Sequence, residues 1–145
     1  MRNFIHQSRF AATPEALFAF HERADIFTLL LPPWQKVQLI SRTGGLEIGA
    51  RVEFRLRFGP FYKTWVAIHI EYEHNRLFTD IQQSGPFRYW RHQHIILPDG
   101  DGSILRDQIE YSLPLGLDPI LGWLVERDLR KMFEYRHRNT ARTLS

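Results

Sequence analysis

Apolar and polar residues alternate along the middle of the chain, in short runs that are separated by turn-forming residues. The run YWRHQHIIL, residues 89–97, places Trp90, His92 and His94 on one side of a strand, because successive strand side chains point to opposite faces. The pattern predicts strands at residues 3–10, 35–41, 50–58, 61–72, 76–83, 89–97 and 104–112. The last six are joined by short turns, which predicts an antiparallel meander within a strongly twisted sheet of seven strands.

Helical patterns lie near the two ends of the chain. Thr13-Pro14-Glu15 supplies an N-cap, a proline at the first helical position and an acid in the first turn, and a second short apolar segment ends at Pro32-Pro33. From Asp118-Pro119 a third pattern predicts a helix of about 20 residues. Its apolar stripe contains Leu121, Leu124, Val125, Leu129, Met132 and Phe133. Helices at the ends and strands between them indicate the α+β class.

The size and composition of the chain favour one ordinary globular domain, spanning residues 1–145. No apolar run approaches the length of a membrane span, and the opening MRNFIHQSRF lacks the apolar core of a signal peptide, so we expect a cytoplasmic protein without stable membrane insertion. The absence of cysteine excludes disulfides, cysteine nucleophiles and zinc-thiolate sites. The chain also lacks a G-x-S-x-G motif, and the Gly44-Gly45 loop precedes a strand rather than a phosphate-binding helix.

The net charge of +3 conceals a basic segment near the C-terminus. It contains Arg127, Arg130, Lys131, Arg136, His137, Arg138 and Arg142. Such a segment suits nucleic acid or an acidic membrane surface, but a solvated helix face with cations toward the negative end of the helix dipole explains it more simply. We therefore expect no nucleic-acid partner, and an interaction or chaperone-like module that uses this basic helix is kept as an alternative.

The turn lengths predict which strand residues face each other. A turn at residues 99–102 sets His94 opposite Asp107 and Trp90 opposite Tyr111, and a turn at His74-Asn75 sets His69 opposite Asp80. The resulting inward strip contains Trp65, His69, Asp80, Gln82, Trp90, His92, His94, Asp107 and Tyr111. The tight turn at Gly59-Pro60 adds Phe54 to the same side. Apolar residues also lie on the other side of the strands at 61–72 and 76–83, which calls for curvature or a bulge.

Three kinds of chemistry suit this strip. Acid-base catalysis would use His94 as the base, with Asp107 fixing its tautomer and Tyr111 donating to an oxyanion. A metal site would use His92 and His94 with Asp80 or Asp107, but a lone His-x-His pair is a weak signal, so we expect no metal and no cofactor. Histidines held by acids also suit a pocket wall that recognises the polar group of a ligand.

Three segments of the chain resemble a known superfamily. They are FAATPEALFAFH (residues 10–21), GPFRYWRHQH (residues 85–94) and DQIEYSLPLG (residues 107–116). With the order of elements, they are similar to the SRPBCC ligand-binding superfamily, which includes START domains, plant pathogenesis-related proteins and polyketide cyclases, and most of all to bacterial members described as cyclase/dehydrase-like. The resemblance spans nearly the whole chain and implies a helix-grip fold, with a hydrophobic cavity between a curved antiparallel sheet and the long helix. The superfamily includes binders, chaperones and enzymes, so the resemblance implies no single activity.

These observations predict a protein that binds a small, mostly hydrophobic molecule beneath the C-terminal helix. The expected ligand-binding residues are Phe54, Trp65, His69, Asp80, Gln82, Trp90, His92, Leu121, Leu124, Val125 and Met132. An enzyme of the cyclase, dehydratase or isomerase type that uses His94, Asp107 and Tyr111 is the alternative. A homo-oligomer is compatible with the sequence.

Overall fold

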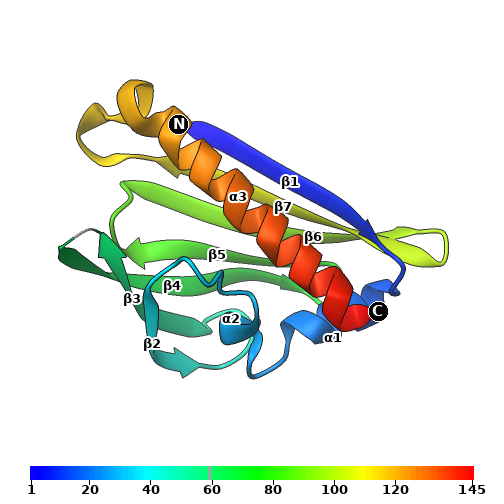
Figure 1. Cartoon of the computed structure of the whole chain (residues 1–145). Coiled ribbons are helices and arrows are strands. Elements are labelled where there is room, and N and C mark those ends of the chain that lie inside the picture. Colours follow the sequence, from blue (N-terminus) through cyan, green and yellow to red (C-terminus); the bar gives the residue numbers. More distant parts are fainter. Residues whose placement is uncertain (59) are drawn as a thin grey trace.

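The computed structural model, which describes residues 1–58 and 60–145, is a curved antiparallel sheet with a long helix across one face (Figure 1). The strands are β1 (Arg2–Phe10), β2 (Val37–Thr43), β3 (Arg51–Phe58), β4 (Phe61–Glu73), β5 (Leu77–Ser84), β6 (Tyr89–Asp99) and β7 (Gly102–Ser112). Their order across the sheet is β1-β7-β6-β5-β4-β3-β2, so six strands form the expected meander and β1 pairs with the last of them. The predicted α+β helix-grip architecture is confirmed.

The helices lie where the sequence predicts them. Helix α1 (Pro14–His21) is capped by Thr13, whose hydroxyl accepts a hydrogen bond from the Ala16 amide at 3.1 Å, and α2 (Ile26–Leu29) follows it. A single 3-10 turn, η1 (Pro114–Gly116), precedes α3 (Asp118–Leu144). Helix α3 has 27 residues and is longer than predicted, because its last turns continue past the apolar stripe. None of the helices in the described chain is long and apolar enough to cross a membrane.

The strand registers agree with those predicted from the turn lengths. His94 pairs with Asp107 and Trp90 with Tyr111 across β6 and β7, while His69 pairs with Asp80 across β4 and β5. Phe54 pairs with Trp65 across β3 and β4, although Gly59 of the turn expected between them lies outside the described residues. These pairings bring the predicted strip onto the concave face, which α3 crosses (Figure 1).

Two register shifts in the β4–β5 ladder explain the apolar residues on its other face. They lie between Val66 and Ala67 and between His69 and Glu71. Trp65, Ala67 and His69 are buried on the concave side, whereas Ile70 is 36% exposed. The expected bulges are therefore present, and the convex face carries some apolar surface.

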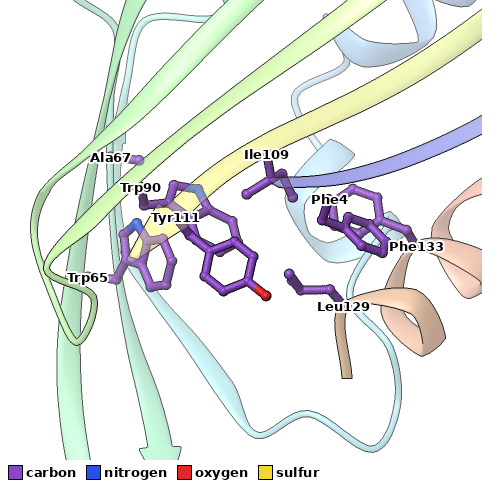
Figure 2. Close-up of a cluster of buried hydrophobic side chains, with 8 residues drawn as sticks. All are labelled: Phe4, Trp65, Ala67, Trp90, Ile109, Tyr111, Leu129 and Phe133. Atoms are coloured by element: carbon purple, nitrogen blue, oxygen red, sulfur yellow. The ribbon is translucent and has the colours of Figure 1, made fainter. Parts of the chain in front are cut away.

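One helix is too narrow to cover this sheet. Seven strands at a spacing of about 4.8 Å span about 29 Å, whereas a helix with its side chains is about 10–12 Å across. Helix α3 packs against β1, and Leu129 and Phe133 join the cluster of Phe4, Trp65, Ala67, Trp90, Ile109 and Tyr111 (Figure 2). A second cluster, with Leu17, Phe18 and Phe78, closes the end of the sheet beneath α1. The concave face over β3 to β5 is left for the shorter α2 to cover.

Candidate functional site

A cavity of about 390 Å³ occupies the space between the concave face, α2 and α3. Its wall contains the aromatic side chains of Phe54, Trp65, Phe87 and Trp90, while α3 contributes Val125, Leu129, Met132 and Arg136. Helix α2 and the segment after it add Ile26, Phe27, Leu30, Leu31 and Pro32. The volume is within the usual range of about 300–1,000 Å³ for small-molecule sites.

Polar side chains gather at one part of this wall. They are His21 of α1, His69 of β4, Asp80 of β5, His92 and His94 of β6 and Arg136 of α3, and the wall also contains Gln35, Arg42 and Asp128. The first six come from two helices and three strands, and the strand pairings from β4 to β7 set the positions of the four on strands. The cavity is thus apolar along most of its wall, with its four histidines close to Asp80 and Arg136.

Asp107 is the centre of a buried hydrogen-bond network beside the polar wall. Its side chain is 4% exposed, and its two oxygens accept hydrogen bonds from His92 Nε2 at 2.7 Å and His137 Nε2 at 2.5 Å. A further hydrogen bond of 2.8 Å joins His137 Nδ1 to the Ser8 hydroxyl. Burial alone raises the pKa of Asp107, but the hydrogen bonds from His137 and His92 hold it well below the ordinary value. The network therefore contains an ionised carboxylate and links β1, β6, β7 and α3.

The pairing of His94 differs from the expected one. Its Nδ1 donates to the Phe78 carbonyl at 3.1 Å, while its Nε2 lies 3.9 Å from the Asp107 carboxylate. The expectation that Asp107 fixes the tautomer of His94 is therefore wrong, because both carboxylate oxygens are used by His92 and His137. Burial lowers the pKa of His94 well below 6.5, so this side chain is neutral at pH 7 and presents an unprotonated Nε2.

Two further histidines are neutral members of the wall. Burial lowers the pKa of His21 to about 4, and its Nδ1 donates to the Leu17 carbonyl at 2.9 Å. Burial also lowers the pKa of His69, and its Nδ1 is buried without a hydrogen-bond partner in the described part of the chain. Such an orphaned polar atom is costly in a protein interior unless a ligand or water satisfies it.

Most of the expected ligand-binding residues lie in the wall, and a few do not. Phe54, Trp65, His69, Asp80, Trp90, His92, Val125 and Met132 line the cavity. Gln82 instead holds the β5–β6 connection, where its amide donates to the Phe87 carbonyl at 2.7 Å and accepts from the Phe87 amide at 3.0 Å. Leu121 is 38% exposed near the start of α3, and Leu124 is half-buried beside the wall residue Val125. Residues three and four apart lie on one face of a helix. The face of α3 that lines the cavity is therefore the one with Val125, Leu129, Met132 and Arg136.

Tyr111 is also separated from the cavity. It is 1% exposed in the core cluster of Figure 2, and its hydroxyl lies 3.4 Å from the Gly122 carbonyl and 3.3 Å from Arg2 Nε. The tyrosine donates to the carbonyl and accepts from the guanidinium, so its hydroxyl supports the contact between β1 and α3. The geometry does not favour its expected role as a donor to an oxyanion.

His137 and Arg136 belong to the site, although the sequence pattern did not predict this. Both were expected on an exposed basic face, whereas His137 is buried and Arg136 is half-buried in the cavity wall. The signal was present in the helical spacing, because Leu129, Phe133 and His137 are four residues apart and therefore lie on one face. The other basic residues of this segment are exposed as expected: Arg127, Arg130, Lys131, Arg138 and Arg142.

Asp80, His92 and His94 carry potential metal-ligand atoms within 4.8 Å of one another. The rings of His92 and His94 are stacked, however, with centroids 3.7 Å apart and planes 28° from parallel. Their in-plane lone pairs then run side by side rather than converge on one ion at about 2.0–2.1 Å. The nitrogen of His94 nearest to Asp80, Nδ1 at 3.9 Å, already donates to the Phe78 carbonyl. This arrangement suits a polar wall better than a metal centre.

The Asp107→Asn substitution tests the network. An asparagine offers one acceptor oxygen, so one histidine would face an NH₂ group, and we expect the free energy of unfolding to fall by about 3 kcal/mol at pH 7. Because the pKa of Asp107 is lowered in the folded state, the wild-type advantage is present above about pH 4 and shrinks as the pH falls further. Urea denaturation at pH 7 and pH 3 measures both effects.

The matched control is Asp99→Asn on the same hairpin, where the carboxylate pairs with Arg9 at the surface. We expect this exposed pair to contribute at most about 1 kcal/mol. Equal stability losses for the two variants would contradict a buried ionised carboxylate at position 107.

Comparisons with known proteins agree with this fold. A comparison with curated protein sequences gives no match. Among solved structures, norcoclaurine synthase from Thalictrum flavum in complex with dopamine and hydroxybenzaldehyde has a TM-score of 0.73 at 16% identity, over 99% of this chain and 86% of that one. A START superfamily protein from Mycobacterium smegmatis has a TM-score of 0.72 at 14% identity, over 98% and 96% of the two chains.

A nucleoside-diphosphate sugar epimerase from Corynebacterium glutamicum has a TM-score of 0.73 at 23% identity, over 97% of this chain but 29% of that one. Likeness at these identities concerns the fold alone. The family evidence comes from a sequence model described as polyketide cyclase / dehydrase and lipid transport, which matches residues 10–134. The chain therefore belongs to the polyketide cyclase / dehydrase and lipid transport family.

Proposed function

We propose that the protein binds a small, mostly apolar molecule in the cavity between the sheet and α3. The observation that carries the proposal is the combination of about 390 Å³ of space, an aromatic and aliphatic wall and one group of polar side chains. The apolar wall would supply affinity through removal of ligand surface from water, and the polar group would set the ligand's orientation. The family description, which includes lipid transport, supports this proposal.

Filling the cavity from α3 tests the proposal. We expect Val125→Trp to weaken binding of the neutral hydrophobic dye Nile red by about tenfold or more, because the indole would occupy the space that the dye needs. Dye fluorescence titrated against protein measures the affinity. Leu124→Trp is the matched control, since Leu124 is the preceding residue of the same helix and lies beside the wall. Equal affinity of the wild type and Val125→Trp would reject this cavity as the binding site.

A second candidate function is acid-base catalysis on the bound molecule. The observation that favours it is the hydrogen bond of 2.7 Å between Asp107 and His92, because His92 lies in the cavity wall and a carboxylate-held imidazole is a common general base. In this arrangement His92 replaces His94 as the base, and Asp107 acts through His92 as a positioning residue. Norcoclaurine synthase, an enzyme of the same fold, shows that the architecture accommodates catalysis.

The His92→Gln substitution separates the two candidates. If the protein is an enzyme, the wild type should convert the molecule that it binds, while His92→Gln should bind it without converting it. Mass spectrometry of the ligand after incubation with each protein provides the measurement. An unchanged ligand with both proteins would leave binding as the function and reject catalysis by His92.

A further inference from the structure

Arg136 brings a positive charge into the cavity wall without a matching acid. It is half-buried on the face of α3 that meets the cavity. Its guanidinium lies 5.0 Å from the centre of the Phe133 ring, and in residues 1–58 and 60–145 no carboxylate lies within ion-pair distance of it. The five N–H donors of this side chain thus have no acceptor from the described chain.

The acids nearest to this position do not neutralise Arg136 directly. Asp107 already accepts hydrogen bonds at both oxygens from His92 and His137. Asp80 lies in the same wall, and one of its carboxylate oxygens is 3.9 Å from Nδ1 of the neutral His94. Burial lowers the pKa of the Arg136 guanidinium, and the more distant charges of Asp107 and Asp80 only partly oppose that effect.

The residues around Arg136 supply acceptors rather than further donors. His21 and His94 each donate Nδ1–H to a backbone carbonyl, so their Nε2 atoms are unprotonated at pH 7. Asp80 is also an acceptor when ionised. The wall contains a second arginine, Arg42, but its Nη1 donates to the Arg23 and Ala24 carbonyls at 3.2 and 3.0 Å. Arg136 is therefore the wall guanidinium without an acceptor in the described chain, and its planar fork fits a carboxylate through two parallel hydrogen bonds.

We propose that the ligand of this cavity is an amphipathic carboxylate, whose carboxylate group pairs with Arg136 while its apolar part lies against Trp65, Trp90 and Met132. This inference rests on the proposed binding function and specifies the chemical class of the ligand. A hydroxyl elsewhere on the ligand would satisfy Asp80 or a neutral histidine. The pairing would also offset the cost of a half-buried guanidinium that has no acceptor in the described chain.

A pair of probes with the same tail tests the inference in the unmodified protein. Decanoate and 1-decanol are titrated against a complex of the wild-type protein with Nile red at pH 7, and displacement gives both affinities. We expect decanoate to bind about tenfold or more tightly than 1-decanol, because a charge-assisted hydrogen-bond pair adds to an equal apolar contribution. Equal affinities, or tighter binding of 1-decanol, would overturn the inference.

Two charge-removing variants of α3 assign the preference to one side chain. Arg136→Gln should remove the advantage of decanoate while leaving the affinity for 1-decanol within about twofold of the wild type. Arg138→Gln, which removes an exposed charge from the same helix, should keep the preference. Loss of preference in both variants would indicate a general attraction of the basic helix for anions and would overturn the assignment to Arg136. If Arg136→Gln still prefers decanoate to 1-decanol, the assignment to Arg136 is also overturned.

The same titrations distinguish this inference from the proposed function. If Nile red and both probes bind without a head-group preference, the cavity binds apolar molecules and only the role of Arg136 is rejected. If none of the three binds the wild type, the binding function and the inference are rejected together. Circular dichroism of Arg136→Gln confirms that its fold is retained, and the wild-type comparison of the two probes stands without any variant.

Discussion

The buried carboxylate of Asp107 is the interaction on which the arrangement of sheet and helix depends. Through His92 and His137 it joins the paired strands β6 and β7 to α3, and Ser8 extends the network to β1. An ionised group at this depth is tolerated only because both of its oxygens are hydrogen-bonded. The network fixes where α3 crosses the concave face, and the apolar cluster of Phe4, Leu129 and Phe133 packs beside it.

The cavity follows from the dimensions of these elements. A helix placed over β1 and its neighbours cannot also cover β3 to β5, since a seven-stranded sheet is more than twice as wide as a helix. The remaining concave surface is lined by Phe54, Trp65 and Trp90 and is closed in part by α2. Large aromatic side chains on a curved sheet thus surround space rather than fill it, which is the physical basis for ligand binding in this architecture.

Much of the fold was predictable from the sequence, because turns of fixed length set strand registers. The pairings of His94 with Asp107 and of His69 with Asp80 are confirmed. Side-chain partners were less predictable, because residues that face each other in a ladder need not form a hydrogen bond with each other. Asp107 accepts hydrogen bonds from His92 and His137, whereas His94 donates to the Phe78 carbonyl of β5. The contribution of Arg136 depends on the rotation of α3 about its axis, which tertiary packing determines.

The polar wall gives the cavity its chemical character. Neutral histidines lie with Asp80 and the half-buried Arg136 in the wall of a mostly apolar space, so orientation of a ligand and chemistry on it would use the same residues. Native mass spectrometry tests the central claim most directly, with wild type and Val125→Trp each incubated with an organic extract of the expression host. The account predicts a one-to-one organic adduct on the wild type that leaves on denaturation and is depleted in the variant. Absence of any adduct on the wild type, or the same adducts on both proteins, would contradict it.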